Sequence, residues 1–80
     1  MRATILVRPK PGILDPQGEA VQSSLRQLGF AVDEARVGRV IDLELGNGAD
    51  REHAHAELEQ MCRRLLANPL IESFEIALDE

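Results

Sequence analysis

The side chains with the most chemical potential are two histidines and one cysteine. His53 and His55 lie two positions apart in a stretch with helical periodicity. They therefore point to different faces and cannot form the i, i+4 pair of a helical zinc site. Cys62 falls on the apolar side of the same stretch, without the basic neighbours and access that a nucleophilic thiol needs. We predict a structural thiol, solvated histidines and no metal site.

Phosphate binding and acid–base catalysis are not supported either. Gly46-Asn47-Gly48 lacks the third glycine of a dinucleotide fingerprint and the Gly-Lys-Ser/Thr of a P-loop, so a turn is predicted there. Acidic residues are scattered and expected on solvated faces: Glu19, Glu34, Asp42, Glu44, Glu57, Glu59, Glu72 and Glu75. No nucleophile, base and oxyanion hole assemble. The chain alone is therefore predicted not to be an enzyme.

Composition excludes further classes of protein. The 80 residues are 44% hydrophobic and 29% charged, which predicts one globular domain over residues 1–80. A net charge of −5, with no Trp or Tyr and only two Phe, argues against nucleic-acid binding. No apolar run, such as Ile5-Leu6-Val7, is longer than three residues, so neither a membrane span nor a signal peptide is expected. One cysteine is weakly indicative of a reducing cytoplasm.

The small core is expected to need a partner surface. A domain of this size rarely gains more than ~3–5 kcal/mol from its core alone. A single cysteine cannot form an internal disulfide or a cysteine-based zinc site. The remaining source of additional stability is association with a second copy or with another protein, and we expect at least a homodimer.

Two elements are predicted in the first third of the chain. Residues 2–8 alternate as a strand, with Ala3, Ile5 and Val7 on one face. Asp15-Pro16 is typical of a helix N-cap followed by proline at the first helical position. This helix is expected to run to about Leu28 and to stop at Gly29.

The stretch from Phe30 to Leu45 is strand-like but too long for one ordinary strand. Gly38 divides it. We expect a hairpin with strands near 31–37 and 40–45. The alternative is a single long strand with a bulge or bend at Gly38.

The sequence pattern in the last third of the chain predicts a helix followed by a strand. The helix begins after Asp50, presents Leu58 and Cys62 inward, and ends at Asn68-Pro69. The strand covers 70–78.

The predicted fold is therefore α+β and ferredoxin-like: βαββαβ, or βαβαβ with a bent long middle strand. Two helices are expected on one face of a mainly antiparallel sheet. A second copy is expected on the other face, which carries Leu6, Val40 and Ala77, or along an edge strand.

The segment from Arg8 to Gly18 is unusual for a strand-to-helix loop. It contains three prolines together with Ile13 and Leu14, whereas such loops are normally shorter and more polar. Two compatible interpretations stand. The loop caps the end of the core, with Leu14 as a hydrophobic staple, or it is a rigid docking element ordered before binding.

Two sequence blocks, taken together, form a specific pattern: Leu14-Asp15-Pro16-Gln17-Gly18 and Leu65-Leu66-Ala67-Asn68-Pro69. In these blocks the chain resembles the PurS family, the small accessory subunit of phosphoribosylformylglycinamidine (FGAM) synthase. Leu28-Gly29-Phe30 and Arg36-Val37-Gly38-Arg39 also fit the family pattern. The resemblance covers nearly the whole chain.

The resemblance implies a non-catalytic structural subunit in de novo purine biosynthesis. It would join an ATP-dependent ligase subunit, which holds ATP and magnesium, to a glutaminase subunit, and it would itself hold no cofactor. The family places no catalytic residue on this subunit. We expect the loop and turn motifs to contact the larger partners: Lys10, Asp15, Gln17, Gly18, Arg36 and Arg39.

Two alternatives remain at this point. One is a ferredoxin-like regulatory module that binds a small metabolite at a dimer interface, although no convergent polar set for a ligand is evident. The other is an RNA-binding ferredoxin-like domain, which the acidic charge disfavours.

Overall fold

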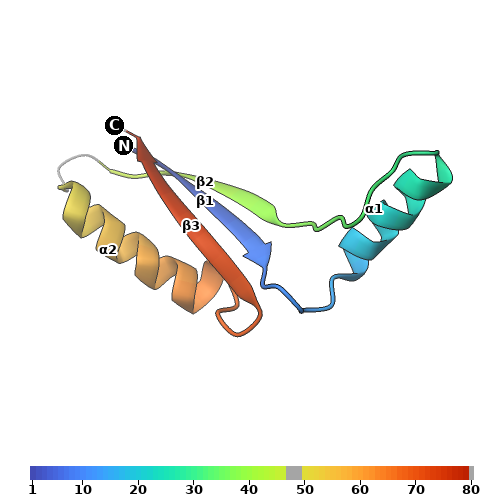
Figure 1. Ribbon diagram of the computed structural model, residues 1–80. Coiled ribbons are helices and arrows are strands. Elements are labelled where there is room, and N and C mark those ends of the chain that lie inside the picture. The colour runs from blue at the N-terminus through green and yellow to red at the C-terminus, as the bar shows by residue number, and fades with distance from the viewer. Residues whose placement is uncertain (47–49, 80) are drawn as a thin grey trace.

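The chain is described by a computed structural model that covers residues 1–46 and 50–79. Three strands and two α-helices alternate along it, and the second helix continues into a π-helical turn, η1 (Figure 1). The elements in chain order are β1 (Arg2–Pro9), α1 (Pro16–Gln27), β2 (Arg39–Glu44), α2 (Arg51–Met61), η1 (Cys62–Leu66) and β3 (Glu72–Asp79).

The strands form one antiparallel sheet in the order β2-β1-β3. Ile5 of β1 lies opposite Ile41 of β2 on one side and Ile76 of β3 on the other. Both neighbours of β1 run against it, so the two chain ends lie together at one end of the sheet (Figure 1). The central strand β1 has partners on both sides, and its residues Ala3 and Ile5, on the side facing α2, are completely buried.

One face of the sheet carries the core. Inward residues of β1 pack against Leu58 and Cys62, and all of these side chains are buried. The α2 helix begins at the N-cap Asp50, whose carboxylate accepts the His53 N–H at 2.7 Å. Its 3.6-residue periodicity then brings Ala54, Leu58 and Cys62 onto the sheet.

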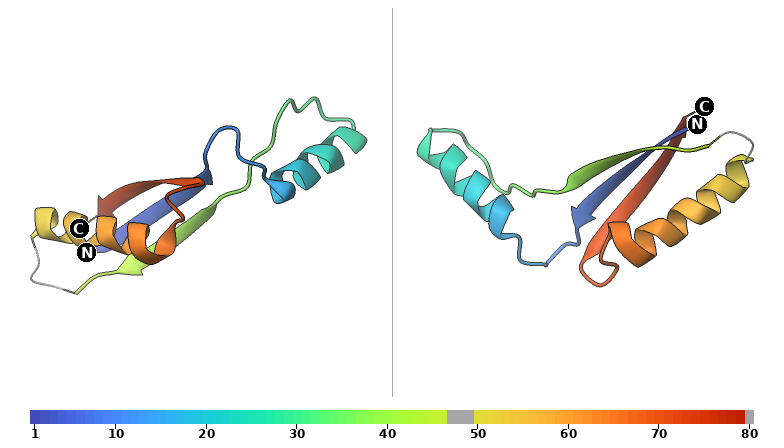
Figure 2. Two further views of the ribbon diagram at one scale, coloured as in Figure 1. Left: turned by 90° about the horizontal axis from the view of Figure 1, so that it is seen from below. Right: turned by 180° about the vertical axis from the view of Figure 1, so that it is seen from behind.

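The α1 helix lies beyond the end of the sheet rather than on it. Residues 10–38, called the arm here, leave β1, form α1 and return to β2 alongside the helix (Figures 1 and 2). The molecule is consequently elongated, with extents of 51 × 25 × 14 Å. Gly29 ends α1 with a φ of 96°, as predicted for the residue after a helix C-terminus.

The α+β class, the antiparallel sheet and the two helices are confirmed. The hairpin prediction is wrong, because residues 31–37 form no strand and the element order is βαβαβ. The long middle strand bent at Gly38, which was the alternative, is not seen either, because β2 covers only Arg39–Glu44. The positions of the helices also differ from the expectation, because within one chain only α2 covers the sheet. The final strand begins at Glu72 rather than Leu70.

Two further sequence predictions concern the turn before α2 and the absence of a membrane span. The predicted turn at Gly46-Asn47-Gly48 falls mostly outside the described residues. Neither α-helix in the described part of the chain is long and apolar enough to cross a membrane.

Candidate partner-binding site

A joint at the base of the arm is built around Asp15. Its carboxylate caps α1 by accepting the Gly18 N–H at 3.1 Å, and it also accepts the Val37 N–H at 2.8 Å. The hydrogen bond from Val37, followed by that from Gly18, lowers the pKa of the Asp15 carboxyl. The Asp15 side chain therefore ties the outgoing segment of the arm, before α1, to the returning segment, after α1.

Two glycines make this joint close-packed. A Cβ at Gly18 would overlap the Asp15 carboxylate and the main-chain carbonyl oxygen of Ala35. A Cβ at Gly38 would overlap the carbonyl oxygen of Val7. The backbone segments approach each other so closely that no side chain fits between them. Glycine is therefore required at both positions, 18 and 38, for the same reason: another segment of backbone or a carboxylate occupies the space of a side chain.

Arg39 connects three segments at the same end of the sheet. Its guanidinium donates to both carboxylate oxygens of Glu72, at 2.7 and 3.1 Å, and to the main-chain carbonyl of Leu66. The bond to Glu72 raises the pKa of Arg39, and the Arg39 guanidinium lowers the pKa of Glu72. Glu72 also accepts the Asn68 N–H at 2.8 Å. Glu72 is thus a structural anchor and not the solvated carboxylate that was predicted.

Lys10 is tied to the loop that leads into β3. Its Nζ donates to the Pro69 carbonyl oxygen at 2.6 Å, and its main-chain N–H donates to the Ile71 carbonyl at 2.9 Å. Gln17 is exposed on the first turn of α1. Arg36 is also exposed, and its Nε lies 3.9 Å from Glu34 Oε1, a separation that gives only a weak ion pair.

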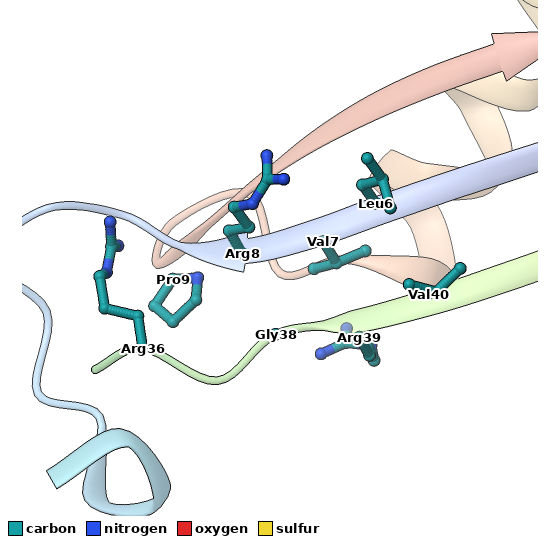
Figure 3. A pocket seen from close by; sticks show the side chains of 8 residues that line it. All are labelled: Leu6, Val7, Arg8, Pro9, Arg36, Gly38, Arg39 and Val40. Carbon is teal, nitrogen blue, oxygen red and sulfur yellow. The ribbon is translucent and has the colours of Figure 1, made fainter. Parts of the chain in front are cut away.

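These residues surround two hollows where the arm joins the sheet. The larger has a volume of about 460 Å³ and lies on the face away from α2, among Leu6, Val40, Arg8 and Arg36. In Figure 3, Arg8 and Arg36 extend to the same side of the chain, whereas Arg39 extends to the other. The smaller, of about 230 Å³, includes Asp15, Gln17, Arg39 and Glu72 in its lining.

The structure thus brings together most of the predicted site residues but gives them different roles. Asp15, Gly18 and Arg39 are engaged in internal contacts. Gln17 and Arg36 present polar groups at the surface beside them, and Lys10 does so while also donating to the Pro69 carbonyl. The sequence reasoning did not single out Arg8, whose Nη1 lies 3.2 Å from Glu75 Oε1. Its position at the end of a strand, just before Pro9, was the available signal.

The groups considered for chemistry lie elsewhere. His53 Nε2 lies 3.0 Å from Glu57 Oε1, and His55 Nδ1 lies 3.6 Å from Glu59 Oε1, each pair being exposed on α2. Cys62 is buried as predicted, and burial raises the pKa of its thiol. Among residues 1–46 and 50–79, no cluster of three or more His, Cys, Asp or Glu side chains is arranged to hold a metal ion.

Comparison with known proteins identifies the family. The family model for PurS, phosphoribosylformylglycinamidine (FGAM) synthase, matches residues 2–80. A PurS subunit of this synthase from Archaeoglobus fulgidus is 40% identical over the full length of both chains. The crystal structure of PurS from Methanocaldococcus jannaschii, described as one of the subunits of formylglycinamide ribonucleotide amidotransferase, superposes with a TM-score of 0.84 at 36% identity, covering 99% of this chain and 95% of the other.

A chain in the structure of PurLQS from Thermotoga maritima also superposes with a TM-score of 0.84, at 31% identity, over 95% of this chain and 93% of the other. That protein is similar in fold as well as in sequence. The match of the family model to nearly the whole chain agrees with both full-length likenesses. The chain therefore belongs to the PurS family of FGAM synthase.

Proposed function

We propose that this chain is a non-catalytic structural subunit of FGAM synthase in de novo purine biosynthesis. It joins the ATP-dependent ligase subunit, where ATP and magnesium act, to the glutaminase subunit in the cytoplasm. The observation that carries the proposal is the likeness to a chain of the PurLQS structure over 95% of the residues. All 80 residues act as one domain, and no cofactor is bound to it.

The base of the arm is the proposed contact surface for the larger subunits. Asp15, Gly18 and Arg39 hold the two connecting segments of the arm and the loop before β3 in a fixed arrangement. This rigidity lowers the entropy cost of binding, because the surface is ordered before the partner arrives. Lys10 and Arg36 present positive charge on a chain whose net charge is −5, so they steer and orient association with an acidic partner surface.

The test is reconstitution of the complex with charge-neutral variants. Lys10→Gln combined with Arg36→Gln removes two surface charges from the base of the arm and spares the Arg39–Glu72 pair. Glutamine-dependent synthase activity is expected to fall at limiting subunit concentration and to recover when excess variant is added. Arg2→Gln is the control, because it removes positive charge at the opposite end of β1.

Three results would contradict the proposal. The double variant could retain full activity at limiting concentration, which would make this surface irrelevant to assembly. A tagged chain could fail to co-purify with a ligase and a glutaminase from its native cell extract. The purified chain alone could hydrolyse ATP or release ammonia from glutamine.

The subunit is also proposed to act as a homodimer. Its fully buried large side chains are few, namely Ile5, Val7, Leu58 and Cys62. A core of this size gives marginal stability without a partner. Sedimentation at micromolar concentration is expected to give twice the chain mass, and a monomer under these conditions would refute the dimer.

A further inference from the structure

Two arginines line one hollow on the open face of the sheet, the face away from α2. The hollow has a volume of about 460 Å³, and Arg8 and Arg36 extend to the same side of the chain beside it (Figure 3). Arg8 belongs to the end of β1, and Arg36 belongs to the returning segment of the arm. The fold therefore brings together two guanidinium groups that lie 28 positions apart in the sequence.

Neither guanidinium is fully engaged by its acidic neighbour. Arg8 Nη1 donates to Glu75 Oε1 at 3.2 Å, which uses one of the five N–H donors of the group. Arg36 Nε lies 3.9 Å from Glu34 Oε1, beyond hydrogen-bond distance. Both carboxylates are exposed to water, so these two ion pairs contribute little. Both arginines can therefore donate to an anion in the hollow without breaking a strong ion pair.

The backbone holds Arg36 beside the end of β1. The next residue, Val37, donates its N–H to the Asp15 carboxylate at 2.8 Å. Gly38 then approaches β1 so closely that a Cβ would overlap the Val7 carbonyl oxygen. The strand β1 is itself fixed between β2 and β3. Because these contacts already exist in the free chain, a bound anion would not have to order the backbone that carries the two arginines.

An apolar floor continues the hollow along the open face. Leu6 and Val40 lie opposite each other in the register of β1 and β2, and both line the hollow. Val40 is 61% exposed, so this floor is open to a ligand. Arg8 follows Leu6 by two positions and lies on the same face, about 7 Å further along β1. A charged end and an apolar end therefore adjoin within the length of a small molecule.

We propose that this hollow binds a small phosphate monoester that carries a flat apolar or heterocyclic group. The phosphate oxygens accept hydrogen bonds from Arg8 and Arg36, and the ring lies on Leu6 and Val40. The planar guanidinium of arginine suits a phosphate, because it can donate two parallel N–H bonds to one anion. The volume is within the range of small-molecule sites, which are concave. This inference goes beyond the proposed subunit role, because it assigns a ligand to the chain itself.

NMR titration of the full chain in phosphate-free buffer tests the proposal. The probe is 1-naphthyl phosphate, and inorganic phosphate and 1-naphthol supply its two parts separately. The ester is expected to shift the amide signals of Arg8 and Arg36 saturably and to bind at least tenfold more tightly than inorganic phosphate. No saturable shift is expected with 1-naphthol.

Two results of this titration would overturn the site. Equal affinity for the ester and for inorganic phosphate would show that the apolar floor takes no part in binding. The absence of any saturable shift with the ester would show that the hollow binds no such ligand, which is also the result expected if a second copy of the chain packs over the open face.

Matched substitutions of the charged residues locate the phosphate. Arg8→Gln and Arg36→Gln are each expected to weaken binding of the ester at least fivefold, with wild-type circular dichroism. Arg2→Gln is the control, because Arg2 lies on the same face at the opposite end of β1. Glu75→Gln removes a carboxylate that competes for Arg8, so this variant is expected to bind the ester more tightly.

The apolar floor is tested by Val40→Ser, which is expected to weaken binding of the ester and to leave the affinity for inorganic phosphate unchanged. If Arg2→Gln weakens binding as much as Arg8→Gln, the attraction is nonspecific and the proposal fails. Weaker binding to Glu75→Gln would contradict it as well. These measurements use the chain alone, so their outcome is independent of co-purification with the ligase and the glutaminase, which remains the test of the subunit role.

Discussion

Adding one methyl group at Gly18 should loosen the base of the arm. The Gly18 Cα faces the Asp15 carboxylate and the carbonyl oxygen of Ala35, and the added Cβ would overlap both. The carboxylate could rotate away only by giving up its bond to the Val37 N–H. The Ala35 carbonyl belongs to the backbone and cannot move without shifting the segment of the arm that returns to β2.

Two opposing terms set the size of the effect. Alanine is a better helix former than glycine, which stabilises α1 by up to ~1 kcal/mol and by less in the first turn. Overpacking a close-fitting site costs ~1–3 kcal/mol. Because the contacted atom belongs to the backbone, we expect the cost of overpacking to exceed the gain in helix propensity. The net loss in the free energy of unfolding is then ~1–2 kcal/mol. A chain of this size should then melt roughly 4–15 °C lower.

Urea unfolding of Gly18→Ala, followed by circular dichroism at fixed chain concentration, measures this loss. Hydrogen exchange at the Val37 amide reports the joint itself, and exchange there should be faster in the variant. Gly46→Ala is the matched control, because a Cβ at Gly46 meets no atom within 4 Å. If Gly18→Ala unfolds like the control and Val37 exchanges at the wild-type rate, the joint is not close-packed as described.

Three further outcomes are expected. Leu58→Ala, which removes a fully buried side chain, should destabilise the fold by ~2–5 kcal/mol in the same urea assay. The lowered pKa of Asp15 means that its contribution to stability is complete above about pH 4 and is lost as the pH falls through the lower folded value. Asp15→Asn should therefore flatten the acid limb of the stability–pH curve, and an unchanged limb would contradict this. Because burial raises its pKa, the Cys62 thiol should react slowly with an aromatic disulfide reagent in the folded chain and rapidly in urea.

The sequence predicted the local elements better than their arrangement. Helix starts at Asp15 and Asp50 were readable, because capping side chains act within three residues along the chain. The prediction of a hairpin at Gly38 was wrong because the role of this glycine depends on a residue far away in the sequence. Gly38 looked like a turn residue, whereas its lack of a side chain serves a close approach to Val7, 31 positions earlier in the chain.

The candidate site shows the same division. The Lys10–Gly18 and Arg36–Arg39 motifs were found from residue types, and the structure places them side by side. The roles of these residues could not be predicted from the sequence, because contacts such as the hydrogen bond from Arg39 to Glu72 join residues 33 positions apart. The position of α1 beyond the end of the sheet could not be predicted from local patterns either, since an amphipathic stripe does not reveal where in the fold the helix lies.

The two chain ends lie together at the end of the sheet opposite the arm (Figure 1). Arg2 pairs directly with Asp79, so the path of the backbone nearly closes on itself. A short peptide could therefore link the ends, and the chain could be reopened elsewhere without changing the sheet. Affinity tags or fluorophores attached at either end would sit about one strand length from the base of the arm, so labelled subunits should report on assembly without touching the contact surface proposed above.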